Sequence, residues 1–193
     1  MTTHYLVRHA KPAATWGEAT DPGLDATGIA QAEKTASELR AKLRQLSLYT
    51  SPMRRCVETA QPLAKLWQVD AALLPEVAEI PSPPLSMLDK QQWLAAGMQG
   101  TWTQLQASSP SGSPDFLAWR ETLLNKLRNL KSDSVIYSHY VAINVVVGAA
   151  QGHDRVLSFR PGHASVTAIE VVDNRFVIKQ LGVEADGGVL LGK

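Results

Sequence analysis

The 193-residue chain has little cysteine: its single thiol, Cys56, has no partner in the chain for a disulfide or for a cysteine-based metal site. Disulfide-rich scaffolds and cysteine-type zinc fingers are therefore excluded. Cys56 lies in the segment 54–60, Arg-Arg-Cys-Val-Glu-Thr-Ala. We interpret it as a small buried side chain, the common state of a free cysteine, with a reactive thiol as the alternative.

Long apolar runs and an excess of one charge are also missing. No stretch approaches the roughly 20 apolar residues that cross a bilayer, and the first residues lack the basic and apolar regions of a secretory signal. Lys and Arg number 19 and Asp and Glu 18, which indicates no general affinity for nucleic acid or anionic membranes. We predict a cytoplasmic protein that binds neither.

Apolar residues are plentiful, at 45% of the chain against 19% charged, which is typical of a globular protein. The length fits a single domain, residues 1–193. Strand-like and helix-like patterns alternate along most of the chain, which predicts a three-layer α/β/α fold with a mostly parallel central sheet. A stretch rich in Pro, Ser and Gly, 81–114, is expected to be an insertion over that sheet.

The expected elements follow from apolar spacing and from turn residues. Strands are expected at 4–7, 46–49, 69–74 and 135–138, a hairpin at 165–172 and 176–181, and helices at 27–46, 51–67, 87–98, 116–130 and 141–150. Asp25 or Thr27 has the residue type of the first helix's N-cap. Ser51 is expected to be the N-cap of the second helix and Pro52 its first residue, because serine and proline are common at these two positions.

Three polar clusters follow expected strands. Arg8-His9 closes the first strand, residues 51–55 follow the second, and Ser138-His139 closes the fourth. In open α/β sheets, ligands bind at the carboxyl ends of strands, beside the helices that follow. If these strands are neighbours, the three clusters form one site.

Such a site has the chemistry of phosphoryl transfer. Arg55 would lie in the first turn of a helix, which favours an anion, and Arg8 adds a second guanidinium group that matches phosphate oxygens. A histidine can attack phosphorus and hold the phosphoryl group, while a second histidine and the arginines stabilise the charge. No cluster has metal-ligand spacing and no Gly-rich phosphate loop is present, so we expect neither a metal nor another cofactor.

At these residues the sequence resembles the histidine phosphatase superfamily, whose fold is also called phosphoglycerate mutase-like. Residues 5–10, Tyr-Leu-Val-Arg-His-Ala, are similar to the opening strand with its Arg-His-Gly signature. Residues 51–60 resemble the Ser-Pro-Leu-x-Arg-Ala-x-Gln-Thr-Ala motif, and 135–139 the strand with the second catalytic histidine. Residues 21–32 and 165–167 match the approach to the first helix and a late strand, so the resemblance covers most of the chain.

The resemblance implies roles for individual residues. His9 would be the nucleophile that forms a phosphohistidine. The phosphate pocket would be completed by Arg8, Arg55 and His139. Glu79, in a Glu-Ile context after the third strand, would be the general acid, with Glu76 as the alternative. An acid that is protonated when the leaving group departs implies a pH optimum on the acidic side of neutrality.

Two positions depart from the family pattern: Ala10 stands where Gly is usual, and Tyr140 where Gly often follows the second histidine. Ala10 is tolerable if its backbone needs no positive φ. Tyr140 either narrows the pocket or points into the helix packing. Neither change removes a reacting group, so we expect an active enzyme, a metal-independent hydrolase of phosphoric monoesters of the histidine acid phosphatase type.

Two alternatives to a phosphatase stay open. A phosphoglycerate mutase-type phosphotransferase is disfavoured because mutases of the family are longer, and because residues 10–13 read Ala-Lys-Pro-Ala where mutases have Gly-Glu-Ser. A non-catalytic phosphate-binding protein on the same fold is disfavoured because all five expected functional groups are present.

The substrate is open between small phosphomonoesters and a protein phosphohistidine. Trp16, Trp93 and Trp102 either line the pocket, which would suit an aromatic leaving group, or pack in the core. Lys11 either meets a second anionic group or is a solvated loop lysine. His163 is expected near the rim of the pocket.

Overall fold

The structure is a computed structural model that describes residues 1–14 and 21–185. Its strands are β1 (Thr2–Arg8), β2 (Ser47–Thr50), β3 (Ala72–Leu73), β4 (Ser134–Ser138), β5 (Val166–Val172) and β6 (Arg175–Gln180). Its α-helices are α1 (Ala26–Lys42), α2 (Arg54–Trp67), α3 (Met87–Gly97), α4 (Trp102–Ser108), α5 (Phe116–Asn129) and α6 (Tyr140–Gln151). A short 3₁₀ helix, Pro75–Val77, follows β3.

The strands form one sheet in the order β3-β2-β4-β1-β5-β6. β1 runs parallel to β4, β4 to β2 and β2 to β3, whereas β5 is antiparallel to both β1 and β6. Parallel neighbours need long crossover connections, which here contain α1, α2 and α5. The prediction of a mostly parallel sheet is confirmed.

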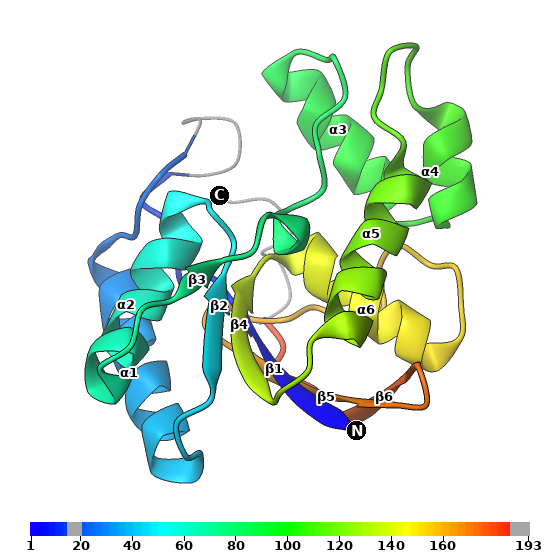
Figure 1. The fold of residues 1–193 in the computed structure, drawn as a ribbon. Helices are drawn as coiled ribbons and strands as arrows, with labels where there is room; N and C mark the ends of the chain where they lie inside the picture. The colour runs from blue at the N-terminus through cyan, green and yellow to red at the C-terminus, as the bar shows by residue number, and fades with distance from the viewer. Residues whose placement is uncertain (15–20, 186–193) are drawn as a thin grey trace.

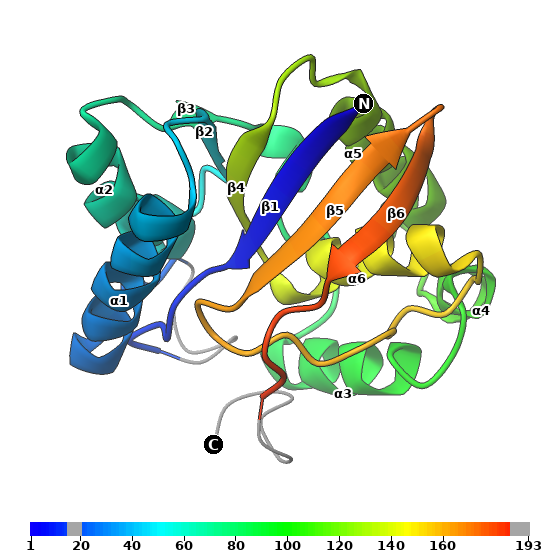
Figure 2. The same cartoon turned by 90° about the horizontal axis from the view of Figure 1, so that it is seen from below.

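Helices cover both faces of this sheet, as Figures 1 and 2 show. Successive side chains of a strand point to opposite faces. Val7 of β1 therefore packs in a core with α1 and α2, while Leu6 packs in a second core with α5 and α6. β4 is buried along its whole length because both of its faces are covered. The three-layer α/β/α architecture is confirmed.

The segment 81–114 carries α3 and α4, which lie beside α5 at one end of the molecule (Figure 1). α4 was not among the expected elements. Its first turn is closed by a capping box between Thr101 and Gln104. That Thr-x-x-Gln spacing is the local signal that predicts the helix. Among the described helices, none combines the length and hydropathy needed to cross a membrane.

The second helix begins at Arg54 and not at Pro52, so Ser51 is not its N-cap. The Ser51 hydroxyl is instead 2.8 Å from Nε2 of His139. The carboxylate of Asp21, distant in sequence, accepts from the Arg54 N–H at 2.9 Å. A cap supplied by another segment leaves no local sequence signal, which explains the error.

The third expected strand, 69–74, shrinks to the two residues of β3. α2 ends with Gln68 in the left-handed conformation, at φ 58°, and the Val69 N–H donates back to the Ala64 carbonyl at 3.1 Å. The start of the expected strand is thus part of the helix terminus.

The first helix ends at Lys42, four residues before the expected end. Leu43 and Leu46 continue the helical spacing, but they reach the same core from beyond the helix. The Asp25 N-cap and the C-terminal hairpin are confirmed. The hairpin turns at residues 173–174, whose φ values of 47° and 64° suit a tight two-residue turn.

Candidate active site

The carboxyl ends of β1, β2 and β4 meet at one edge of the sheet. The His9 N–H donates to the Ser138 carbonyl at 2.9 Å, and the Ser51 N–H donates to the Tyr137 carbonyl at 2.9 Å. The three polar clusters that follow these strands therefore converge. This is the juxtaposition that the sequence predicts if the strands are neighbours.

His9 follows β1 directly, and its side chain is buried with a ring centroid 5.3 Å from that of His139. Its Nδ1 lies 2.9 Å from the Ala10 carbonyl oxygen. A carbonyl only accepts, so Nδ1 carries the proton and Nε2 keeps a free lone pair in the neutral ring. Burial, then His139, Arg8 and Arg55, lower the pKa of His9 well below 6.5, which keeps the ring neutral at neutral pH.

His139 is fully buried between the end of β4 and the start of α6. Arg55 Nη2 donates to its Nδ1 at 3.2 Å, so its proton lies on Nε2, which donates to the Ser51 hydroxyl. Burial, then the charges of Arg55 and Arg8, lower the pKa of His139 well below 6.5. The two neutral histidines thus hold opposite tautomers.

Two buried arginines reach these rings from different elements. Arg55 lies in the first turn of α2, where free N–H groups favour an anion, and Arg8 is the last residue of β1; each is 8% exposed. Burial lowers the pKa of Arg8 to about 10, so it stays charged at neutral pH. Two guanidinium groups beside two neutral imidazoles form a pocket suited to a phosphoryl dianion.

Glu79 lies over the N-terminus of α6. Its carboxylate accepts from the Val141 and Ala142 N–H groups at 3.1 and 3.2 Å. The Ser138 hydroxyl holds the same segment by donating to the Val77 carbonyl at 2.7 Å. Burial raises the pKa of Glu79, although the hydrogen bonds from the backbone act in the opposite direction.

Glu76, the alternative acid, lies elsewhere. Its carboxylate is 3.0 Å from the Lys126 ammonium group on α5. The charge of Glu79, by contrast, acts on both Arg8 and Arg55. The structure therefore brings together all five residues that the sequence singled out, and it leaves Glu76 outside the cluster.

Ala10 has no positive φ, so its backbone has no need of glycine. Its N–H donates to the Thr59 hydroxyl at 3.0 Å, which in turn donates to the Arg55 carbonyl at 2.6 Å. This relay ties the backbone after β1 to the first turn of α2. Tyr140 is buried, and its ring centroid lies 4.9 Å from Cζ of Arg8.

Three further residues join the site. His163 accepts from Arg8 Nη2 at 3.1 Å, and its ring centroid lies 5.8 Å from that of His9. Cys56 is buried with its sulfur 3.4 Å from Nε2 of His139, and burial raises the pKa of its thiol, which fits the unreactive interpretation. The hydrogen-bonding role of Thr59 was missed, although the motif at 51–60 contains it.

Two of the three tryptophans considered above pack in or against the core. Trp102 is 1% exposed within the core on the α5 side, and Trp93 packs against the same core. Trp16 lies outside the described residues. Lys11 is exposed and forms an ion pair with Asp25 at 2.9 Å. In the described part of the chain, no group of three or more His, Cys, Asp or Glu side chains is arranged to hold a metal ion.

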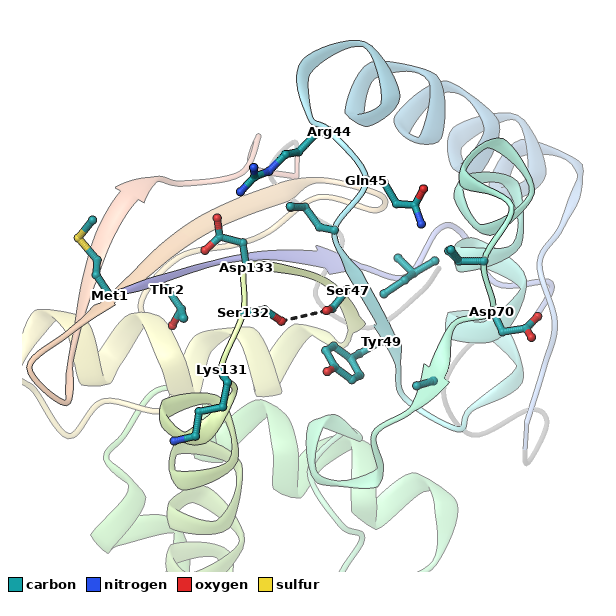
Figure 3. A pocket seen from close by; sticks show the side chains of 14 residues that line it. Met1, Thr2, Arg44, Gln45, Ser47, Tyr49, Asp70, Lys131, Ser132 and Asp133 are labelled. Atoms are coloured by element: carbon teal, nitrogen blue, oxygen red, sulfur yellow. Dashed lines mark hydrogen bonds between the residues drawn. The ribbon is translucent and has the colours of Figure 1, made fainter.

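A separate groove of about 830 Å³ lies at the opposite edge of the sheet, where β1, β2 and β4 begin (Figure 3). Its charged lining residues are of both signs: Arg44, Asp70, Lys131 and Asp133. None of its lining residues is a histidine or belongs to the cluster described above. The groove therefore lacks the pair of histidines that the cluster brings together.

Comparisons with known proteins agree with this geometry. The profile of the histidine phosphatase superfamily (branch 1) matches residues 4–184. A search of curated proteins gives no match. A phosphoserine phosphatase mutant from Entamoeba histolytica, solved with phosphoserine, superposes with a TM-score of 0.72 at 19% identity, covering 94% of this chain and 96% of that one.

Two further solved structures have the same fold. A putative alpha-ribazole-5'-P phosphatase from Escherichia coli has a TM-score of 0.74 at 19% identity, with 97% of this chain and 98% of that chain covered. A phosphoglycerate mutase from Thermus thermophilus has a TM-score of 0.62 at 24% identity, with 96% and 100% covered. The profile match extends over nearly the whole chain, and the protein therefore belongs to the histidine phosphatase superfamily (branch 1).

Proposed function

We propose that this protein is a metal-independent phosphatase that hydrolyses phosphomonoesters through a phosphohistidine on His9. The observation that carries the proposal is the tautomer of His9: its Nδ1–H is held by the Ala10 carbonyl, which leaves the Nε2 lone pair free beside two buried arginines. A free imidazole nitrogen at an anion pocket is the arrangement that nucleophilic attack on phosphorus requires.

In the first step, Arg8 and Arg55 bind the phosphoryl oxygens, His139 holds Arg55 in place by accepting at Nδ1, and Nε2 of His9 attacks phosphorus. The N–P bond forms as the bond to the ester oxygen breaks, and Glu79 gives its proton to the departing alkoxide. The ring of the phosphohistidine carries a positive charge, which the hydrogen bond to the Ala10 carbonyl stabilises.

In the second step, water attacks the phosphohistidine and Glu79 accepts its proton. The N–P bond breaks, orthophosphate leaves, and both residues return to their starting states. Guanidinium groups neutralise the phosphoryl charge throughout, so the chemistry needs no metal. Small phosphomonoesters and a protein phosphohistidine both present the dianionic group that this pocket recognises.

Hydrolysis of para-nitrophenyl phosphate in the presence of EDTA tests the proposal. We expect the unmodified protein to turn over, His9→Ala to lose turnover, and the matched control His153→Ala to retain it, since His153 lies at the C-terminal end of α6. Mass spectrometry of a rapidly quenched reaction should find the phosphoryl group on His9.

Loss of activity on adding EDTA would contradict the metal-free mechanism. Equal activity in His9→Ala and the unmodified protein would exclude His9 as the nucleophile. A protein that binds phosphate but turns over no monoester and no phosphohistidine would be a phosphate-binding protein, and transfer of the phosphoryl group between positions of phosphoglycerate would make it a mutase.

A further inference from the structure

The guanidinium group of Arg8 is held by the protein on three sides. Nη1 donates to the Pro161 carbonyl at 2.9 Å, and Nη2 donates to Nε2 of His163 at 3.1 Å. The ring of Tyr140 packs against its face, with Cζ 4.9 Å from the ring centroid. Each contact restricts a different movement of this long side chain.

These contacts leave part of the guanidinium group free for a ligand. Arginine has five N–H donors, and the protein takes one from each terminal nitrogen of Arg8. Its Nε–H is buried and has no acceptor among the described residues. A buried donor without a partner is costly, so an oxygen placed there gains more than it would at an exposed arginine.

His163 is fixed by the backbone of the site. The next residue, Ala164, has a left-handed φ of 56°, a conformation that costs a non-glycine residue energy unless its surroundings impose it. Its N–H donates to the Arg8 carbonyl at 3.1 Å, and its carbonyl accepts from the Thr35 hydroxyl at 3.0 Å. The loop that carries His163 is thereby tied to the end of β1.

Tyr140 acts through its ring. It is 7% exposed, and its hydroxyl is buried without a hydrogen-bond partner in the described residues. The ring follows His139 at the start of α6, so the element that presents the second histidine also supports Arg8.

We propose that His163 and Tyr140 are positioning residues that hold the Arg8 guanidinium in place for the phosphoryl group. The inference rests on the proposed function, and neither residue belongs to the expected phosphate pocket. His163 supplies an acceptor that fixes rotation about the end of the side chain, and Tyr140 supplies a flat surface that fixes its plane.

The His163 contact depends on the protonation of the ring. Nε2 accepts from Arg8 only while it is unprotonated, because arginine is never an acceptor. Arg8 and His9, at the end of β1, lie beside this ring, and the charges of Lys11 and Asp25 also act on it. Burial, then Arg8 and Lys11, lower the pKa of His163 to about 4, so the contact is intact over the range in which we expect activity.

Paired substitutions test the proposal. His163→Leu removes the acceptor, whereas His163→Gln keeps an acceptor oxygen near the position of Nε2; Tyr140→Leu removes the ring, whereas Tyr140→Phe keeps it. His153→Leu is the matched control. We would titrate each variant with orthophosphate, determine kcat and KM for para-nitrophenyl phosphate, and check folding by thermal unfolding.

We expect each Leu variant to weaken orthophosphate binding roughly tenfold, the scale of one lost charge-assisted contact, and to raise KM more than it lowers kcat. His163→Gln and Tyr140→Phe should recover most of that affinity. Unchanged phosphate affinity in both Leu variants would overturn the proposal, as would equal losses in the Leu variant and its conservative counterpart.

The phosphate titration separates this proposal from the proposed function. If the unmodified protein binds phosphate but hydrolyses no ester, the phosphatase proposal fails and the binding data alone decide the role of the two residues. If it hydrolyses esters and the Leu variants bind phosphate normally, only the positioning role fails. If it binds no phosphate, both fail.

Discussion

In the proposed mechanism, the reactivity of His9 depends on a hydrogen bond to its own neighbour. Because the Ala10 carbonyl fixes the proton on Nδ1, the lone pair of Nε2 has a fixed direction before any substrate arrives. Burial and the two arginines lower the pKa of His9, so its ring is already unprotonated near neutral pH. In the proposed mechanism, the same arginines bind the substrate and keep the attacking ring neutral.

In the proposed mechanism, the pH dependence of activity follows from His9 and Glu79. His9 must be unprotonated to attack, so activity rises as pH passes its pKa, which lies well below 6.5. Glu79 must be protonated to release an alcohol, so activity falls as pH passes its pKa, which is raised above 4.5. We expect a bell-shaped profile of kcat/KM with its maximum on the acidic side of neutrality, measured with an alkyl phosphate such as glycerol phosphate.

Glu79→Gln should lower the hydrolysis of the alkyl phosphate by about 10²- to 10⁴-fold and remove the alkaline fall. The comparison is made in kcat/KM, which reports only the first step. Para-nitrophenyl phosphate is the control, because its leaving group departs without protonation, so its kcat/KM should fall much less. If kcat/KM of Glu79→Gln still falls at alkaline pH, that fall belongs to another group. Equal losses of kcat/KM with both substrates would exclude Glu79 as the acid.

The five candidate site residues could be singled out from the sequence, because each stands at the end of an expected strand or in a family motif. The partners that set their protonation could not. The acceptor for Nδ1 of His9 is a backbone carbonyl, which any residue at position 10 would supply. The bonds from Ser51 to His139 and from Arg8 to His163 join segments far apart in the chain, so local spacing does not reveal them.

At the scale of elements, close packing between α1 and the segment that follows β1 fixes the position of the backbone beside His9. Gly28 in the first turn of α1 lies so close to this segment that a Cβ atom would be 2.1 Å from the Lys11 carbonyl oxygen. Only glycine allows this approach. The helix and the backbone beside His9 are thereby held at contact distance.

Gly28→Ala is expected to destabilise the protein by about 1–3 kcal/mol, because the backbone of Lys11 must shift to admit the methyl group. The shift should also lower kcat/KM, since the moved segment begins one residue after Ala10. Thermal unfolding and kinetics measure the two effects. Exposed Thr27→Ala in the same turn is the control, and a stable, fully active Gly28→Ala would contradict the close approach.

Trp102 tests the role of the helices in the segment 81–114. Because its side chain is 1% exposed in the core, Trp102→Ala should cost about 3–5 kcal/mol of unfolding free energy. Trp102→Phe, which remains folded, should leave the KM for para-nitrophenyl phosphate unchanged. A raised KM in Trp102→Phe with little loss of stability would place this side chain in the pocket instead.

The elements with strong periodicity could be predicted, and the errors have different physical causes. The predicted start of α2 was wrong because the carboxylate that caps the helix, Asp21, comes from another segment. The predicted third strand was too long because Val69 belongs to the end of α2. α4 was missed although its capping box is a local signal.

On the scale of the whole molecule, two cores lie on opposite faces of one sheet, and the same strands contribute side chains to both. Loss of either core therefore removes support from the other. We expect one cooperative thermal transition, with coincident midpoints for tryptophan fluorescence and far-UV circular dichroism. Two separated midpoints would show that the chain contains independently folding parts.

Orthophosphate should bind only the folded protein and so raise the midpoint of that transition. At a concentration one hundred times its dissociation constant, it should add about 2.7 kcal/mol to the free energy of unfolding. Arg55→Ala is the control and should show little increase.

The order of strands, and with it the convergence of the site, could be predicted only conditionally from the sequence, because spacing along a chain does not determine which strands pair.

The sheet order has a consequence for how the protein is made. β1 leaves the ribosome before either of its two neighbours, which are β4, residues 134–138, and β5, residues 166–172. The hydrogen bond from the Arg8 N–H to the Ser165 carbonyl also forms only after residue 165 has been synthesised. The proposed nucleophile is thus synthesised before the segments that complete its surroundings, and a nascent chain carries His9 before the site around it exists.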